Sequence, residues 1–447
     1  MTDLRNKGPA RTNLLTASAA RAAMAAGELT AEALVSDCLA RIRARGAELG
    51  AWALVDPDRA LQQARALDCI PPRGVLHGIP VGIKDVLDTC DMTTAHGSVI
   101  YQGARPGNDS ACVAALRRAG AVILGKTATT EFASPIAIGV RNPHDTTRTP
   151  GVSSSGSAAA VADFMVPLAL GTQTGGSVIR PATYCGIYGY KATISSLDRG
   201  GIRHLRPSLD TLGLFARSLP DIALLRAALL GGAPGVAAWP KGKVPRLGLC
   251  RTHQWPLATP ETQAAIAGAA RKLAAGAEII EIELPDMFAD ALDAFAVIAA
   301  LEGARSLERE IREHPDTMNP WLREAAAKAA SITDEHYQAA LAHAAECRVH
   351  LSRVFGEVDA LITPATAGEA SQKLTGLEDQ SFCPLWTMMH GPCVSIPAFT
   401  GPSGMPMGLQ VVGPIHGDDR VIGICAWIAE ALAPLPIPSM PGVGTTS

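Results

Sequence analysis

The feature that most constrains the fold is an alternation of strand-like and helical segments between residues 74 and 126. The runs VLHGIPVGIKD (75–85) and AVILGK (121–126) are short, apolar and strand-like, and DSACVAALRRAG (109–120) between them has helical periodicity. Strands that alternate with helices on this scale are typical of an α/β core. The chain is therefore predicted to form an α/β fold.

Other elements follow from periodicity and capping residues. Two helices are predicted over 17–42, because a glycine and a threonine N-cap interrupt the helical pattern at 27–30. Residues 157–171 (SAAAVADFMVPLALG) predict a buried helix that leads into a strand. Further helices are predicted over 219–230 and 419–432, and further strands over 246–250, 358–366 and 404–413.

Residues 259–355 differ from the rest of the chain in composition. They are rich in Ala, Glu, Arg and Leu with helical periodicity, interrupted at Pro285, Pro315 and Pro320. We interpret this stretch as a helical layer or cap.

Composition argues against several classes of protein. The 447 residues include 39 Lys and Arg against 42 Asp and Glu, a net charge of −3, which offers no electrostatic footprint for nucleic acid or anionic lipid. The ten cysteines form no C-x-x-C pair or zinc-type cluster. The first residues lack the apolar core of a signal peptide, and no run of 18 apolar residues follows. We expect a cytoplasmic protein with reduced cysteines, no metal or cofactor, and no nucleic-acid or membrane partner.

Residues 120–127, GAVILGKT, match the phosphate-binding pattern G-x-x-x-x-G-K-[ST]. A phosphate-binding loop follows a strand and opens a helix, so that free backbone N–H groups face the anion. Here a predicted helix precedes the segment, and its Val-Ile-Leu interior suits a buried strand. We therefore interpret it as a strand.

Three segments indicate chemistry: LHGIPVGIKD (76–85), GVSSSGS (151–157) and GTQTGGS (171–177). Lys84 ends an apolar strand-like run, where a buried ammonium group loses solvation and its pKa falls towards neutrality. Such a lysine can act as a base, which a serine hydroxyl needs in order to become a nucleophile. The glycine-rich turn can present the backbone N–H groups of Thr174, Gly175, Gly176 and Ser177 to a developing oxyanion.

Each segment alone has a simpler interpretation. A single lysine at a strand end is more often exposed, here paired to Asp85, and a single Gly/Ser segment is more often a flexible loop. A Ser-His-Asp triad is the competing chemistry, but the sequence has no G-x-S-x-G elbow and its eleven histidines show no partner pattern. The combination of the three segments favours the lysine–serine chemistry.

Together these segments resemble the amidase signature family, whose hallmarks are a G-I-P-x-x-x-K-D strand, a G-G-S-S-x-G-S loop and a G-G-S turn. RAGAVILGKTATTEFA, SLDTLGLFARSLPDIALL, DALITPAT and GMPMGLQVVG also resemble family segments, in the family's order. The resemblance implies a mixed, mostly parallel central sheet covered by helices on both faces. It implies a single domain over 1–447, with a signature core over 60–215 that holds the catalytic residues.

The resemblance also implies roles for individual residues. Lys84 matches the base, Ser153 the shuttle serine that follows a cis peptide bond, and Ser177 the nucleophile of an acyl-enzyme mechanism. Ser154 matches a supporting serine expected to hydrogen-bond the lysine. The implied activity is hydrolysis of a carboxamide to an acid and an amine or ammonia, with esters or carbamates as further substrates.

The chain departs from the family pattern in two places. Val152 stands where glycine is usual before the shuttle serine. Gln173 and Ile179 stand where the family commonly has an acidic residue and an arginine. We hypothesise that a neutral contact between Gln173 and Ile179 replaces that buried ion pair, and that Arg180 faces elsewhere.

Two alternatives to a free-standing amidase stay open: an amidase subunit of a tRNA-dependent amidotransferase, and a non-catalytic binding protein on the same scaffold. The substrate pocket is expected to be lined by residues 285–350 and by loops near Trp386 and Met388, with apolar side chains that favour a neutral substrate. Family habit makes a homodimer possible.

Overall fold

The computed structural model describes residues 11–233, 235 and 238–433. Its strands are β1 (Trp52–Val55), β2 (Pro80–Lys84), β3 (Val122–Thr127), β4 (Ile136–Ile138), β5 (Leu168–Gln173), β6 (Tyr188–Lys191), β7 (Thr211–Ala216), β8 (Arg246–Cys250), β9 (Glu278–Ile282), β10 (Ala360–Pro364), β11 (Thr375–Leu377), β12 (Cys393–Thr400) and β13 (Pro406–Val412). Its helices are α1 (Ala17–Ala25), α2 (Ala31–Leu49), α3 (Pro57–Asp68), α4 (Ala111–Arg118), α5 (Ser155–Ala162), α6 (Ile179–Tyr184), α7 (Leu219–Leu230), α8 (Pro260–Leu273), α9 (Ala291–Ser306), α10 (Glu308–Glu313), α11 (Pro320–Ala329), α12 (Asp334–Glu357), α13 (Pro384–Met388) and α14 (Asp418–Leu432).

Eleven strands form one twisted sheet in the order β1-β3-β2-β5-β7-β6-β12-β13-β10-β8-β9. Parallel pairing occurs in two blocks, β3-β2-β5 and β10-β8-β9. The strands between them, from β5 through β7, β6, β12 and β13 to β10, pair antiparallel. The predicted mixed sheet is therefore confirmed, with its parallel pairs in the two blocks and not in the middle.

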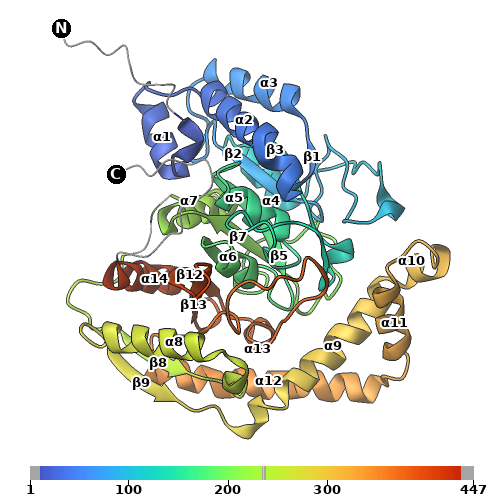
Figure 1. The fold of residues 1–447 in the computed structure, drawn as a ribbon, viewed down its shortest axis with the longest axis vertical. Coiled ribbons are helices and arrows are strands. Elements are labelled where there is room, and N and C mark those ends of the chain that lie inside the picture. Colours follow the sequence, from blue (N-terminus) through green and yellow to red (C-terminus); the bar gives the residue numbers. More distant parts are fainter. Residues whose placement is uncertain (1–10, 234, 236–237, 434–447) are drawn as a thin grey trace.

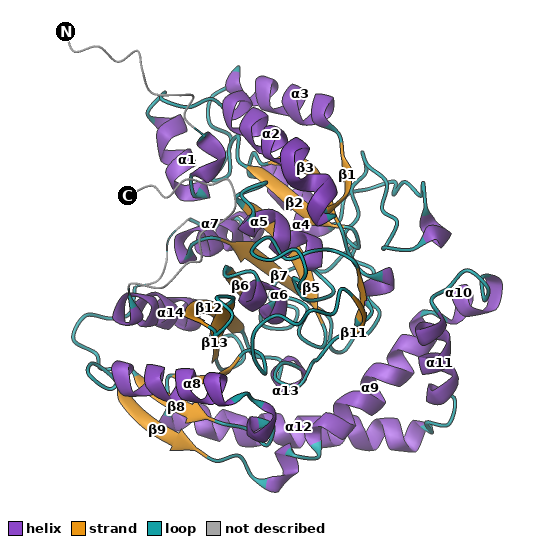
Figure 2. Ribbon diagram, viewed as in Figure 1, coloured by secondary structure: helices purple, strands orange, loops and turns teal. Residues whose placement is uncertain are grey.

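Helices cover the sheet on both faces, as predicted (Figures 1 and 2). The short helices α5 and α6 contact each other and together span strands from β3 to β13. The helices α4, α7, α14 and α8 form a second connected layer on strands β6, β7, β10, β12 and β13. The strands β2, β3, β5 and β7 are buried along their whole length, and α5 packs against all four.

The elements predicted from local pattern lie where expected. Thr30 caps α2 through its side chain, which accepts from the Ala33 N–H, and Gly27 before it has φ +73°. The GAVILGKT segment follows α4 and forms the buried strand β3, with the Lys126 ammonium donating to the Leu87 carbonyl at 2.8 Å. It therefore has the geometry of a core strand and not of a phosphate-binding loop.

Residues 259–355 are mostly helical, with α8 to α12 interrupted by β9. Figure 1 shows α9, α10, α11 and α12 gathered along one end of the molecule, where α9 contacts α10, α11, α12 and α13. The division into a single domain over 1–447 with a core over 60–215 stays a prediction, and the two ends of the chain lie outside the described residues. Among the described helices, none is long and apolar enough to cross a membrane.

Candidate active site

Lys84 ends β2 and is completely buried. The strand β2 lies inside the sheet, between β3 and β5. The Lys84 Nζ donates to Ser153 Oγ at 2.7 Å and to Thr172 Oγ1 at 2.8 Å, both neutral hydroxyls. Burial lowers the pKa of Lys84 from 10.5 to about 7, and the negative charge of Asp210 opposes that shift.

The alternative of an exposed Lys84 paired to Asp85 is excluded by the geometry. The Asp85 carboxylate lies 3.3 Å from Lys126 Nζ, on the neighbouring strand β3. It also accepts from the Ala95 N–H at 3.2 Å. Lys84 is left among hydroxyls, with no carboxylate partner in the described part of the chain, which is the environment required of a neutral lysine base.

Ser153 lies in the loop that leads into α5. The peptide bond between Val152 and Ser153 is cis, as the family resemblance implied. Gly151 before it has φ +83°, and a β-carbon there would lie 3.1 Å from the Pro181 backbone. This close packing of the loop against the start of α6 directs Ser153 Oγ towards Lys84.

Ser154 does not contact the lysine, so the expectation that it would hydrogen-bond Lys84 was wrong. Its hydroxyl donates to the Thr172 carbonyl at 3.1 Å and accepts from the Thr172 N–H at 3.3 Å. Ser154 is the N-cap residue of α5, and its hydroxyl reaches the backbone of β5 instead. These two hydrogen bonds hold Thr172 in place, and the Thr172 hydroxyl is the second hydrogen-bond partner of Lys84.

Ser177 lies in the turn between β5 and α6 and is 8% exposed, at the edge of a cavity. Gly176 has φ +124°, and a β-carbon there would lie 2.9 Å from Cys383 Cβ. Within the described part of the chain, the backbone N–H groups of 174–177 donate no hydrogen bond. The hydroxyls of Ser177 and Ser153 are likewise not hydrogen-bonded to each other. The N–H groups of this turn are thus free to meet a ligand.

Gln173 and Ile179 are in contact, as hypothesised. The Gln173 Oε1 accepts from the backbone N–H groups of Val178 at 2.9 Å and Ile179 at 3.0 Å, and its Nε2 donates to Thr387 Oγ1 at 3.1 Å. The amide therefore satisfies two N–H groups at the start of α6 without any charge. Arg180 faces elsewhere, with Nη2 donating to the Val152 carbonyl at 2.6 Å.

Two residues next to the site, Thr172 and Asp210, were not predicted from the sequence. Thr172 faces Lys84 because of the parallel register of β2 and β5, in which Ile83 lies opposite Leu170. Asp210 accepts from the Thr174 hydroxyl and, at 2.7 Å, from the Leu205 N–H, so it holds the turn before Ser177. The segment SLDTLGLF, which contains Asp210, carried a family resemblance but no pattern that would place its carboxylate here.

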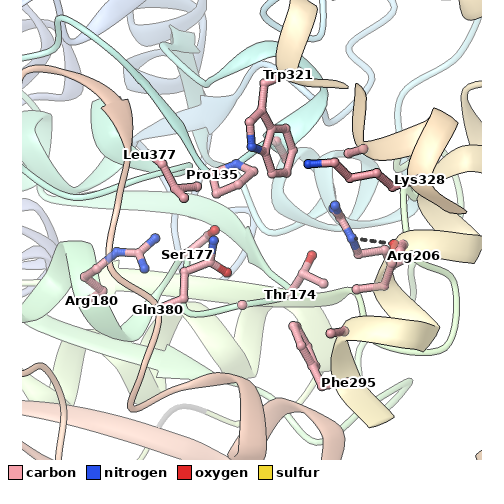
Figure 3. A pocket seen from close by; sticks show the side chains of 16 residues that line it. Pro135, Thr174, Ser177, Arg180, Arg206, Phe295, Trp321, Lys328, Leu377 and Gln380 are labelled. Carbon is pink, nitrogen blue, oxygen red and sulfur yellow. Dashed lines mark hydrogen bonds between the residues drawn. The ribbon is translucent and has the colours of Figure 1, made fainter. Parts of the chain in front are cut away.

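The cavity beside Ser177 has a volume of about 310 Å³ and opens between the turn and the helices α9 and α11 (Figure 3). Phe295 from α9 and Trp321 from α11 supply apolar walls, which confirms the expectation for residues 285–350. Trp386 and Met388 do not line it, contrary to expectation, because α13 turns both side chains into the core. Leu377 and Gln380 line the cavity in their place.

A group of side chains that could hold a metal ion lies elsewhere. Cys90, Asp91 and Asp109 have ligand atoms within 4.8 Å of one another. Both carboxylates are already paired with guanidinium groups, of Arg59 and Arg117. These cations neutralise the acidic group, and the cluster is not connected to the cavity.

The fold and the buried lysine–serine site together define a hydrolase of the amidase type. A family model described as Amidase matches residues 33–422. The chain belongs to the Amidase family and is an amide-hydrolysing enzyme.

Known relatives agree with this assignment. The glutamyl-tRNA(Gln) amidotransferase A-subunit of Salinispora arenicola is 33% identical over 96% of this chain and 100% of its own length. The corresponding A-subunit of Chloroflexus aggregans is 35% identical over 89% of this chain and 92% of its own. The peptide amidase from Stenotrophomonas maltophilia superposes with a TM-score of 0.81 at 28% identity, over 95% of this chain and 98% of that one.

Proposed function

We propose that the chain hydrolyses a carboxamide to a carboxylic acid and an amine or ammonia through an acyl-enzyme on Ser177, with Lys84 as base and Ser153 as proton shuttle. The observation that carries this proposal is the 2.7 Å contact between the buried Lys84 Nζ and Ser153 Oγ, together with the contact of Lys84 to Thr172 on β5, the strand that leads into the Ser177 turn. A lysine with a pKa of about 7 is substantially neutral at physiological pH and can accept a proton.

In the proposed mechanism, neutral Lys84 keeps one N–H donated to Thr172 and accepts the hydroxyl proton of Ser153. Ser153 takes the proton of Ser177 as the Ser177 oxygen attacks the carbonyl carbon. The carbonyl oxygen becomes an anion, which the free N–H groups of the turn at 174–177 would stabilise.

Collapse of this intermediate breaks the C–N bond. Ser153 then gives its proton to the leaving amine and regains one from protonated Lys84. Water attacks the acyl-enzyme by the same relay in a second cycle and releases the acid. Esters and carbamates would react through the same kind of intermediate and are proposed as further substrates.

A second candidate is a component of a tRNA-dependent amidotransferase, and the similarity to the amidotransferase proteins of Salinispora and Chloroflexus supports it. The two candidates differ in whether the chain needs partner proteins. We expect the purified chain alone to release ammonia from primary amides and amines from anilides, and the Ser177→Ala variant to release neither. Activity that appears only after the other amidotransferase components are added would replace the first candidate with the second.

The role of Lys84 can be tested through Thr172, whose hydroxyl accepts from the ammonium. Removing that acceptor destabilises the charged form, so Thr172→Val should lower the pKa of Lys84 further. We expect the acid limb of the kcat/KM profile, near pH 7 in the wild type, to move down by about half to one pH unit. Thr172→Ser should restore it. If the kcat/KM profile is unchanged in Thr172→Val as well as in Thr172→Ser, Lys84 is not the titrating base.

We also propose a cytoplasmic location, which the ten free cysteines support, since eight are buried and none is paired in a disulfide.

A further inference from the structure

The cavity beside Ser177 is positively charged, although the chain as a whole is slightly acidic. Among the described residues that line it, three are cationic, Arg180, Arg206 and Lys328, and none is Asp or Glu. The chain carries a net charge of −3. The excess of positive charge is therefore local to this cavity and does not follow from overall composition.

Arg206 reaches the cavity from the loop before β7. Its Nε donates to the Ala299 carbonyl on α9 at 3.2 Å, and among the described residues its two terminal nitrogens donate no hydrogen bond. Burial lowers the pKa of Arg206, while Asp210 and Glu302 oppose that shift. A guanidinium has five N–H donors, so several stay available for a ligand in the cavity.

The two acidic residues nearest Arg206 are committed to other donors. Asp210 accepts from Thr174 and from the backbone N–H groups of Leu205 and Arg206 itself. Glu302 accepts from the Ser208 N–H at 3.1 Å and the Tyr337 hydroxyl at 2.7 Å. Neither carboxylate lies within ion-pair distance of the Arg206 guanidinium, so the cation faces the cavity without a paired anion from the residues that the structure describes.

Lys328 supplies a second cation on the same side. Its ammonium forms no hydrogen bond or ion pair with any described residue, and the side chain extends from α11 toward Trp321 (Figure 3). Figure 3 shows Lys328 and Arg206 on one side of the cavity and Ser177 and Arg180 on the other. Between the two sides lie apolar walls that include Phe295 and Pro135.

We propose that the substrate is an amide joined by an apolar spacer to an anionic group, with the anion held between Arg206 and Lys328. This inference rests on the proposed function, because it assigns the amide to Ser177. An arginine fork with a nearby ammonium is a geometry suited to a carboxylate. Because no acidic residue lines the cavity, a substrate with a free ammonium near its carboxylate is disfavoured, and the expectation of a neutral substrate is replaced.

The test compares matched amides that differ only in charge. Monoamides of linear dicarboxylic acids place the carboxylate on the acyl side, and N-acetyl ω-amino acids place it on the amine side; the methyl esters or terminal amides are neutral matches. We expect one of the two charged series to exceed its neutral match about tenfold or more in kcat/KM at an optimal spacer length. That preference should decrease as salt is raised.

Three variants connect the preference to the proposed cations. Lys328→Met should reduce the charged-to-neutral ratio of kcat/KM about fivefold, mainly through KM, and Lys328→Glu should reduce it further. Arg206→Gln should reduce it about tenfold or more, and its thermal melt verifies folding. Lys241→Met, which removes an exposed lysine that does not line the cavity, should keep the wild-type ratio.

The outcomes separate this inference from the proposed function. If the wild type hydrolyses neutral amides as well as charged ones, and Lys328→Glu does not change the ratio, the anion site is wrong while the amidase stands. If Ser177→Ala hydrolyses every substrate as fast as the wild type, the proposed function is wrong.

Discussion

Replacing Ser177 with alanine is expected to reduce amide hydrolysis by at least about 10⁴-fold, because it removes the nucleophile and leaves the relay without a proton to transfer. The variant should still fold, since the Ser177 hydroxyl forms no hydrogen bond with any described residue. Incubation with an activated ester, followed by intact-protein mass spectrometry, should show one acyl adduct on the wild type and none on Ser177→Ala.

Ser155→Ala is a matched control at the start of α5. The Ser155 hydroxyl is buried and has no hydrogen-bond partner in the described part of the chain, so its loss should leave activity within about twofold. If Ser177→Ala still forms the adduct, another nucleophile carries the reaction. If the adduct forms on Ser177 but amides are not cleaved, the relay through Ser153 is the part that must be revised.

How far the site could be predicted depends on whether a residue's partner is local in sequence. Lys84, Ser153 and Ser177 each stand in a distinctive segment, and the resemblance supplied their association. Thr172 could not be recognised, because its contact with Lys84 depends on the register between β2 and β5. Ser154 was assigned to the wrong partner, since its direction depends on where α5 begins.

In the fold, too, features with a local sequence pattern were predicted and features that depend on distant partners were not. Helices with capping residues and strands bounded by turns were found, as in α2 and α7. The antiparallel middle of the sheet was not predicted. Its strands β6, β7 and β12 are buried on both faces, so their sequences carry no alternating pattern that distinguishes them from a buried helix. The cavity walls were predicted from α9 and α11 but misplaced at α13, where an apolar segment fills the core instead.

Replacing Lys84 with methionine is expected to abolish turnover, by at least about 10³-fold, and at the same time to stabilise the fold at neutral pH. The ammonium is fully buried, no carboxylate of residues 11–233, 235 or 238–433 pairs with it, and its pKa falls from 10.5 to about 7 on folding. At and below pH 7 this difference corresponds to a cost of about 4–5 kcal/mol. Loss of the two hydroxyl contacts offsets about 2 kcal/mol. The net gain for Lys84→Met is therefore about 2–3 kcal/mol.

The pH dependence of that gain distinguishes it from a packing effect. Between the folded pKa of about 7 and the unfolded value of 10.5, only the unfolded wild type binds the proton, so its stability rises with pH by about 1.4 kcal/mol per unit. The advantage of Lys84→Met should thus be largest at pH 6.5 and should vanish near pH 9. Denaturant unfolding of both proteins at the two pH values measures it, with Lys241→Met as the control that should show neither effect. Destabilisation by Lys84→Met at pH 6.5 would mean that the buried lysine is not an uncompensated charge, and the proposed base would lose its physical origin.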